Sequence, residues 1–560
     1  YSDEGRLKVK EFFDKDSKSI GKQEYGYDGL GRLTLEKDIN GLETTHEYSR
    51  NNEGLSVKTT TIHGSKFNSD CVDRVYKYTY NQHDQVIEIE LPNGGKIVNE
   101  YESGLLRQKK DEFGRVTKYE YDKNNRVSAM DECGLKTEYR YDKNGNIVKE
   151  IKGAGTKNRQ VKEYKYNFNG QVEEYINPLG GKTTYKYDAA GNMIKTVDPF
   201  GNETKYKYNS MKKPIEMIDA KGNIYKLEYD ENGNNTKVIA PDRSITTYEY
   251  DALNRLKASV DSMKLRIEYE YDVFGRIKKQ SDNANELSKN QHGQNVIENI
   301  YDDQKGTFQV QHKVGDKVVE TTSYTYDAYN NVTSVKTSDD QTIKYHYDVM
   351  GNVEKVIDHD GVETIYGYDY KQSNQPKSKR IKYYPGDDAG SKPMKDRVWE
   401  YSYDAQTGRL IKSKDPKGYE SQYGYDVYGN LTSIIDALNK TETYKYNAMN
   451  QISEYTDRNN RHKSFEYDQM GRLKKKNIAN TIGERDVCQE IYEYDKLGNI
   501  KEVRNCAISN NVTQYEYNWS GNMIYQKDAN GGEHRYHYDG HGNPTIYIDP
   551  EGNQTHMDYD

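Results

Sequence analysis

Tyrosine and aliphatic residues alternate with polar residues in short runs along most of this chain. Between Tyr187 and Tyr208 the sequence reads YDAAGNMIKTVDPFGNETKYKY, in which MIKTV and ETKYKY both show this alternation. A period of two is typical of β-strands, because successive side chains of a strand point to opposite faces of its sheet. The pattern therefore predicts short strands that are separated by equally short turns.

Two kinds of turn separate the predicted strands. Residues 188–192, DAAGN, place Gly191 where a three-residue hairpin loop needs a positive φ, and Asp188 where its side chain can bond its own turn. Residues 198–202, DPFGN, place Pro199 where its fixed φ starts a turn and Gly201 where the turn ends. One unit is therefore a β-hairpin plus the turn that leads to the next hairpin.

A three-residue loop fixes which residues face each other across the hairpin. The expected pairs are Tyr187 with Met193, Tyr185 with Lys195, and Thr183 with Val197. One face of the sheet would then be rich in tyrosine and aliphatic side chains, and the other face would be mostly polar. Tyrosine suits the first face because its ring covers neighbouring strands while its hydroxyl reaches water or a partner.

The same unit recurs along the whole chain. The tyrosines that precede the hairpin turns, here called marking tyrosines, are 21 residues apart from Tyr166 to Tyr271. About 24 such units fit into the chain, and a fixed period of this length is typical of a repeat protein. We expect the recurring tyrosine, aspartate and glycine to be structural residues, as in Tyr27, Asp28 and Gly31; Tyr141, Asp142 and Gly145; Tyr271, Asp272 and Gly275; and Tyr425, Asp426 and Gly429.

These recurring residues also resemble a known family. The segments YDGLGRL at 27–33, YDKNGNI at 141–147, YDVFGRI at 271–277 and YDVYGNL at 425–431 are similar to those of the RHS or YD-repeat family. The resemblance covers essentially the whole chain. It implies an all-β strip of tandem hairpins that is wound as a spiral into a hollow shell. Such shells occur in toxin-enclosing subunits of bacterial toxin complexes, in polymorphic toxins and wall-associated proteins, and in animal teneurins.

The unbroken repeat predicts a single body over residues 1–560, cut from a longer protein, rather than several domains. Because only 33% of the residues are hydrophobic, we expect a thin wall without a large solid core. Longer intervals between marking tyrosines predict insertions near 49–79, 279–300, 371–398 and 474–491. A long strip has exposed edges, so we also expect successive coils to pair edge to edge.

Charge and cysteine content narrow the list of partners. The formal net charge of −8 argues against nucleic acid as a partner, since binding it requires a basic face. No apolar run approaches the length of a membrane span, so we expect none in this segment. The cysteines Cys71, Cys133, Cys488 and Cys506 lie at four different phases of the repeat. We therefore expect no disulfide.

The sequence shows no pattern typical of an enzyme or a cofactor site. The turn 142–146, DKNGN, resembles the start of a calcium loop but lacks the glutamate at the twelfth position. Known phosphate-binding, metalloprotease and nucleophile motifs are missing. The histidines His534, His537, His541 and His556 fall on different strands, faces or turns, so we expect no shared zinc ion. We expect no catalytic residue, no metal and no cofactor.

The insertion near 371–398 is the candidate contact region. It carries Lys377, Lys379, Arg380, Tyr383 and Tyr384. Insertions in repeat proteins usually form loops on one face, where partners bind. These residues form either a longer hairpin tip or a binding loop.

Two functions remain open from the sequence. The family resemblance implies the shell of a large secreted or cell-surface bacterial protein, which encloses or presents a C-terminal toxin or other cargo segment outside this chain. The alternative is an adhesive or fibrous surface protein whose tyrosine-lined grooves bind carbohydrate or neighbouring cells.

Overall fold

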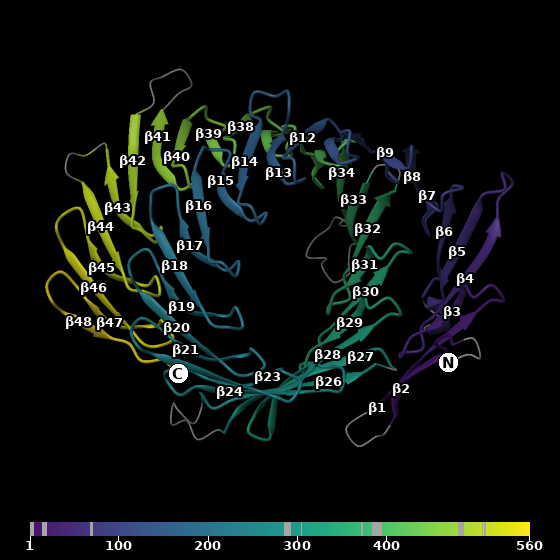
Figure 1. Ribbon diagram of the computed structural model, residues 1–560, viewed down its shortest axis with the longest axis horizontal. Coiled ribbons are helices and arrows are strands. Elements are labelled where there is room, and N and C mark those ends of the chain that lie inside the picture. The colour runs from purple at the N-terminus through teal and green to yellow at the C-terminus, as the bar shows by residue number, and fades with distance from the viewer. Residues whose placement is uncertain are drawn as a thin grey trace. The chain divides into compact units, whose positions relative to one another are not determined.

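The chain forms one long ribbon of β-hairpins (Figure 1). The computed structural model describes residues 5–13, 19–67, 71–284, 293–303, 305–370, 373–382, 395–479, 487–506, 508 and 511–559. Within them, 48 strands belong to one sheet, and neighbouring strands run antiparallel and follow one another in the chain. The predicted all-β fold of tandem hairpins is therefore confirmed.

The strands are short, as the alternation predicted, and one short helix, α1 (Gly64–Phe67), lies between β5 and β6. In chain order the strands are β1 (Val9–Phe13), β2 (Ser19–Tyr27), β3 (Leu33–Lys37), β4 (Glu43–Arg50), β5 (Ser56–Ile62), β6 (Arg74–Tyr80), β7 (Val86–Glu90), β8 (Lys96–Glu102), β9 (Leu105–Lys110), β10 (Val116–Tyr121), β11 (Val127–Glu132), β12 (Leu135–Tyr141), β13 (Ile147–Lys152), β14 (Gln160–Tyr166), β15 (Val172–Ile176), β16 (Lys182–Tyr187), β17 (Met193–Val197), β18 (Glu203–Tyr208), β19 (Pro214–Ile218), β20 (Ile224–Tyr229), β21 (Asn235–Ile239), β22 (Ile245–Tyr250), β23 (Leu256–Val260) and β24 (Arg266–Tyr271). They continue as β25 (Ile277–Asp282), β26 (Asn295–Asp302), β27 (Thr307–Val314), β28 (Lys317–Tyr326), β29 (Val332–Lys336), β30 (Thr342–Tyr347), β31 (Val353–Ile357), β32 (Glu363–Asp369), β33 (Ser373–Ile381), β34 (Arg397–Tyr403), β35 (Leu410–Lys414), β36 (Glu420–Tyr425), β37 (Leu431–Ile435), β38 (Thr441–Tyr446), β39 (Ile452–Thr456), β40 (His462–Tyr467), β41 (Leu473–Ala479), β42 (Val487–Tyr494), β43 (Ile500–Asn505), β44 (Val512–Tyr517), β45 (Met523–Lys527), β46 (Glu533–Tyr538), β47 (Pro544–Ile548) and β48 (Gln554–His556).

The register of β16 with β17 differs from the predicted one beyond the first pair. Tyr187 pairs with Met193 as expected, but Tyr185 pairs with Thr196 rather than with Lys195. The register shifts because β17 carries one extra residue, Ile194, as a β-bulge. Alternation alone could not show this, because a bulge moves every later pair by one position.

The bulge also changes which residues share a face. Thr184, not the expected Thr183, pairs with Val197. The side chain of Val197 therefore lies on the polar face of the sheet, not on the tyrosine-rich face. The same shift precedes Tyr208 on β18 and Tyr229 on β20, so it belongs to the repeat. In β17 the tyrosine-rich face therefore carries Thr196 where Val197 was expected.

The sheet has almost no buried interior. Among the described residues no large side chain is fully buried, and most of the buried hydrophobic residues are alanines, as in Ala129, Ala258, Ala328 and Ala479. Most strand residues are half-exposed on both faces. Each side chain thus lies on a single sheet rather than between two layers, which agrees with the low hydrophobic content.

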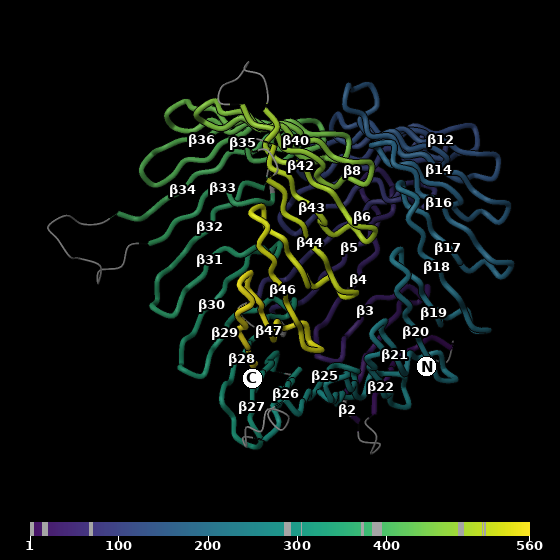
Figure 2. The backbone as a smooth tube through the Cα atoms, turned by 90° about the vertical axis from the view of Figure 1, so that its left-hand side faces the viewer, coloured from purple at the N-terminus to yellow at the C-terminus, as the bar shows by residue number. Residues whose placement is uncertain are grey.

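The ribbon divides into two compact units. Unit 1 comprises residues 1–134, 270–280 and 295–423, and unit 2 comprises residues 135–269, 281–294 and 424–560. Each unit thus holds two long stretches of ribbon, here called its first and second pass. In Figure 2 the purple and green stretches are the two passes of unit 1, and the blue and yellow stretches are those of unit 2.

Candidate functional site: turns, tyrosines and the contacts between passes

Each hairpin turn is closed by its own aspartate. In the turn 188–192 the Asp188 N–H donates to the carbonyl of Asn192 at 2.9 Å, and Gly191 has a φ of 86°. The Asp188 carboxylate accepts the N–H groups of Ala190 and Asn192 at 3.0 and 2.8 Å. Hydrogen bonds from the Asn192 side chain and from these amides favour the charged carboxylate, so they hold the pKa of Asp188 below its ordinary value.

The other predicted repeat residues adopt the same geometry. Asp28, Asp142, Asp272 and Asp426 each accept two backbone N–H groups of their own turn. The glycines Gly31, Gly145, Gly275 and Gly429 all have positive φ. In the second kind of turn Pro199 follows Asp198, and Gly201 with a φ of 82° donates to the Asp198 carbonyl at 3.0 Å. Tyr27 and Tyr141 pair with Leu33 and Ile147, as Tyr187 does with Met193, while Tyr271 and Tyr425 end β24 and β36.

A hydrogen bond ties many of the marking tyrosines to the preceding hairpin. The Tyr208 hydroxyl donates to the carbonyl of Met193 at 2.8 Å. The register of β17 with β18 ends at the pair of Lys195 and Lys205, so this carbonyl lies beyond the paired part of the strands. The phenol thus supplies the hydrogen bond that the ladder does not provide. The same bond joins Tyr187 to Val172, Tyr48 to Leu33, Tyr121 to Leu106, Tyr229 to Pro214, Tyr250 to Asn235, Tyr347 to Val332, Tyr368 to Val353, Tyr446 to Leu431, Tyr467 to Ile452 and Tyr538 to Met523.

This role of the tyrosine was missed by sequence reasoning. The signal was present, because donor and acceptor are 15 residues apart in each of these pairs. The acceptor is the first residue of the second strand of the preceding hairpin, except for Leu106, which is the second residue of β9. The bond uses a backbone carbonyl, so it requires no particular acceptor side chain, although most acceptors are apolar, as are Leu33, Met193 and Val353.

Within unit 2 the second pass docks on the first pass through turns. We distinguish YD turns, which follow a marking tyrosine, from linking turns such as 198–202, which join one hairpin to the next. The hydroxyl of Tyr428, in a YD turn, donates to the carbonyls of Lys152 and Asn158 at 3.1 and 2.8 Å. The carbonyl of Gln469, in the next YD turn but one, accepts the side-chain amide of Asn177 at 2.7 Å.

The contacts continue in order along both passes of unit 2. Lys221 forms an ion pair with Asp495 at 2.6 Å. Further along, the Tyr225 hydroxyl donates to the carbonyl of Trp519 at 3.4 Å, and their rings meet edge to face. His541 contacts Asp261 at the last turn of the series. The hydrogen-bonded partners between the passes of unit 2 are 270 to 294 residues apart.

The expected edge-to-edge pairing of coils is therefore wrong, and the two passes meet turn to turn. The physical reason is that each hairpin already uses its strand edges to pair with its neighbours in the ribbon. The turns are then what remains along the two borders of the ribbon. We call this row of contacts in unit 2 the seam.

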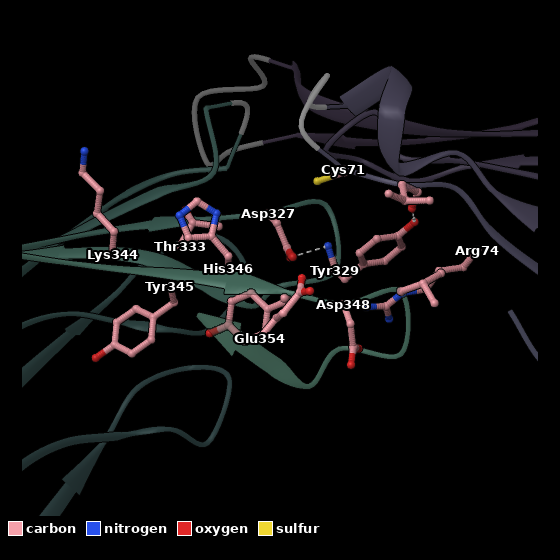
Figure 3. A pocket seen from close by; sticks show the side chains of 13 residues that line it. Cys71, Arg74, Asp327, Tyr329, Thr333, Lys344, Tyr345, His346, Asp348 and Glu354 are labelled. Carbon is pink, nitrogen blue, oxygen red and sulfur yellow. Dashed lines mark hydrogen bonds between the residues drawn. The ribbon is translucent and has the colours of Figure 1, made fainter. Parts of the chain in front are cut away.

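Unit 1 contains a corresponding contact at Tyr329 (Figure 3). The Tyr329 hydroxyl donates to the carbonyls of Val72 and Ile62 at 2.5 and 3.4 Å. The Arg74 guanidinium lies 3.6 Å from the centre of the Tyr329 ring. Burial of the phenol, which disfavours its anion, raises the pKa of Tyr329 to about 12. Cys71 and Arg74 of the first pass thus surround a tyrosine of the second pass.

The cavity beside Tyr329 has a volume of about 320 Å³ and is lined by acidic, basic and aromatic side chains. Two of its three carboxylates, Asp327 and Asp348, accept the N–H groups of their own turns, so they serve the fold. In Figure 3, Lys344 and Tyr345 point away from Tyr329. The arrangement is that of a packed contact between passes.

The residues that reach across share one position in their turns. Tyr329, Tyr428 and His541 each stand two residues after the aspartate that closes the turn. Sequence reasoning missed them, although an aromatic or histidine side chain at a turn tip was a visible signal. Turn chemistry alone calls for small or polar residues there.

The residues of the candidate contact loop are partly on a strand. Lys377, Lys379 and Arg380 lie on β33, whereas Tyr383 and Tyr384 lie outside the described residues. The partners of the three cations are Asp369 at 3.4 Å, the Trp399 ring at 5.4 Å and Asp396 at 3.9 Å, respectively. The three cations thus interact with residues on or beside β32 and β34.

The expectation of no disulfide is wrong. Cys488 on β42 is bonded to Cys506 just after β43, with their Cα atoms 5.5 Å apart. The Cys506 N–H donates to the carbonyl of Gln489 at 2.9 Å, which holds the two cysteines side by side. Repeat phase misled the prediction because Cys488 precedes Tyr494 and Cys506 follows it, on the two arms of one hairpin. Residues that face each other across a hairpin always lie at different distances from their next marking tyrosines.

The histidines near the C-terminal end take different partners. His534 contacts the Tyr547 hydroxyl at 2.7 Å, and His541 contacts Asp261. Among the residues that the structure describes, no group of three or more His, Cys, Asp or Glu could hold a metal ion. Over the same residues, no helix has the length and apolar character needed to cross a membrane.

Comparison with known proteins adds family and structural matches. The family model "Teneurin YD-shell" matches residues 123–288 and 450–560, and the model "RHS Repeat" matches residues 326–361, 403–441 and 425–462. Similar solved structures include the Tc holotoxin pore of Photorhabdus luminescens, with 15% identity over 96% of this chain and 31% of that chain and a TM-score of 0.46. Another is the TcdB2–TccC3 complex, with 12% identity over 97% of this chain and 38% of that chain and a TM-score of 0.40. No curated protein matches the chain.

The chain spans about a third of the length of those solved chains. Their low TM-scores carry no argument, so the assignment rests on the two family models, which together match more than half of the chain. The ranges that the models match also repeat the turn geometry seen at Asp188 and Gly191 and the hydroxyl hydrogen bond seen at Tyr208. On this evidence the chain belongs to the RHS/YD-repeat family.

Proposed function

We propose that this chain is a stretch of shell wall in a large secreted or cell-surface bacterial protein, which encloses or presents a toxin or other cargo segment. The observation that carries the proposal is the seam of unit 2. Successive turns of the second pass meet successive turns of the first pass, from Tyr428 to His541. A strip whose passes are joined in this way is a continuous surface rather than a string of hairpins.

Such a wall acts by steric exclusion, because it keeps other molecules away from the segment that it encloses. Its backbone groups are used within the sheet, and its passes are held together by the ion pair of Lys221 with Asp495 and by hydrogen bonds such as that of Tyr428. A barrier of this kind separates a harmful or unfolded segment from proteases. No catalytic group is needed for this role.

The proposal is tested by protease protection of the full-length protein. Lys221→Glu places a second negative charge beside Asp495 and should open the seam, since like charges repel. Lys143→Glu is the matched control, because Lys143 is an exposed lysine in a YD turn of the first pass. The non-repeat segment should resist cleavage in the unchanged protein and in the control, and be cleaved faster in Lys221→Glu. Equal and rapid cleavage in all three proteins would overturn the proposal, and a rod-shaped envelope of the full-length protein would favour the adhesive alternative.

A further inference from the structure

The linking turn 177–181, in the first pass of unit 2, differs at both ends from the linking turn that follows it. It reads NPLGG, whereas turn 198–202 reads DPFGN. Asn177 thus stands in the place of an aspartate, and Gly181 stands in the place of an asparagine. The turn itself does not require these exchanges. Its positive φ of 80° belongs to Gly180, and an aspartate closes the next turn with the same two backbone hydrogen bonds.

Both exchanged residues contact the second pass. The side-chain amide of Asn177 donates to the carbonyl of Gln469 at 2.7 Å. An aspartate in its place could not form this bond, because an ionised carboxylate only accepts hydrogen bonds. Gly181 is buried, and a Cβ there would lie far inside van der Waals distance of the same carbonyl oxygen. Because this neighbour is backbone, rotation of a side chain cannot relieve the clash.

The next linking turn meets the second pass less closely. There, Asn202 and Lys496 hold the places of Gly181 and Gln469. Asn202 and Lys496 line a cavity of about 320 Å³, whereas the approach at Gly181 leaves no room even for a Cβ. The close approach is therefore a property of turn 177–181.

We propose that Asn177 and Gly181 set the register in which the second pass of unit 2 closes on the first. Because the repeats are alike, a pass that slid by one repeat would meet another set of equivalent turns. Gln469 would then face turn 198–202, whose aspartate cannot donate and whose asparagine leaves no room for the close approach. Its carbonyl would lose a hydrogen bond, so the slipped register is less stable. The inference goes beyond the proposed function, because it holds whatever the wall encloses.

Carbodiimide coupling followed by mass spectrometry reads the register, because it joins a lysine to a carboxylate in direct contact with it. Lys221 should couple to its ion-pair partner Asp495 in the unchanged chain. After a slip of one repeat, Lys221 would lie where Phe200 now contacts Arg472. Asp468 closes the turn of Arg472, so Lys221 should then couple to Asp468. The ratio of the Asp468 product to the Asp495 product therefore measures slippage.

The variant Asn177→Asp/Gly181→Asn has an ordinary linking turn in this place. Its ratio should rise by about five-fold or more, since the facing carbonyl loses its hydrogen bond and the added side chain forces the turns apart. Gly29→Ala is the control and should keep the ratio of the unchanged chain, because φ at Gly29 is not positive and a Cβ there would contact no residue beyond its chain neighbours. The product of Lys207 with Glu216, on neighbouring strands, should form equally in every variant and shows that the ribbon is folded.

Moving the two residues by one repeat gives the sharper test. Adding Asp198→Asn/Asn202→Gly to the first variant places the donor and the glycine in turn 198–202, so the ratio should rise further. An unchanged ratio in Asn177→Asp/Gly181→Asn would overturn the proposal. So would a combined variant whose ratio is no higher than that of Asn177→Asp/Gly181→Asn.

Discussion

The Tyr208 hydroxyl donates to the carbonyl of Met193 at 2.8 Å, across the pair of strands β17 and β18. The tyrosine begins one hairpin turn, and its acceptor starts the second strand of the preceding hairpin. Each marking tyrosine with this bond therefore fixes two consecutive units to each other. This explains the period of the sequence better than ring packing alone, because packing tolerates phenylalanine and this bond does not.

Replacing Tyr208 with phenylalanine should cost about 1 kcal/mol in the free energy of unfolding, since a half-buried carbonyl loses its hydrogen bond. Tyr206→Phe is the matched control, because Tyr206 lies two residues away on the same face and pairs with Met217. Urea unfolding of both variants measures the difference. If Tyr206→Phe costs as much as Tyr208→Phe, the hydroxyl bond is not what the tyrosine contributes.

The turns and the hairpin unit could be predicted from the sequence because their chemistry is local. Asp188 and Gly191 occupy positions that only a few residue types fill well, and the pair of Tyr187 with Met193 follows from the loop length. The bulge at Ile194 could not be predicted, since any residue can be the extra one. Tyr428 contacts residues that the repeat phase does not reveal, because the contact depends on how another pass of the ribbon is placed. The disulfide of Cys488 with Cys506 was missed because the two arms of one hairpin carry them at different phases of the repeat.

The chain should lose stability in acid through its turn aspartates. Hydrogen bonds from Asn192 and from backbone amides hold the pKa of Asp188 below its ordinary value, and the equivalent groups Asp142 and Asp230 behave alike. A carboxyl group with a lowered folded-state pKa contributes stability above its unfolded pKa of about 3.9 and loses it as pH falls through the folded value. The urea midpoint should therefore be nearly constant from about pH 7 to 5 and fall below about pH 4. A fall that begins near pH 6 would point to histidines instead.

The disulfide between Cys488 and Cys506 should stabilise the region around β42 and β43. It closes a loop with a sequence separation of 18 residues, and a loop of that length is expected to contribute about 3 kcal/mol by restricting the unfolded chain. Cys488→Ser should lower the unfolding free energy by that amount without reductant. Adding reductant should lower the stability of the unchanged chain to the level of the variant and leave the variant unaffected. A variant that still responds to reductant would show that another bond is involved.

The central claim is that two passes of the ribbon, far apart in sequence, join through their turns. Zero-length carbodiimide coupling tests it directly, because this reagent adds no spacer and joins an amine to a carboxylate only where the two come into direct contact. Lys221 and Asp495 are 2.6 Å apart across the seam, and Lys207 and Glu216 are 2.7 Å apart on neighbouring strands and serve as the positive control. Mass spectrometry should find both cross-linked peptides in the unchanged chain, and only the second in Lys221→Arg. Recovery of the Lys207 and Glu216 product without that of Lys221 and Asp495 would contradict the seam.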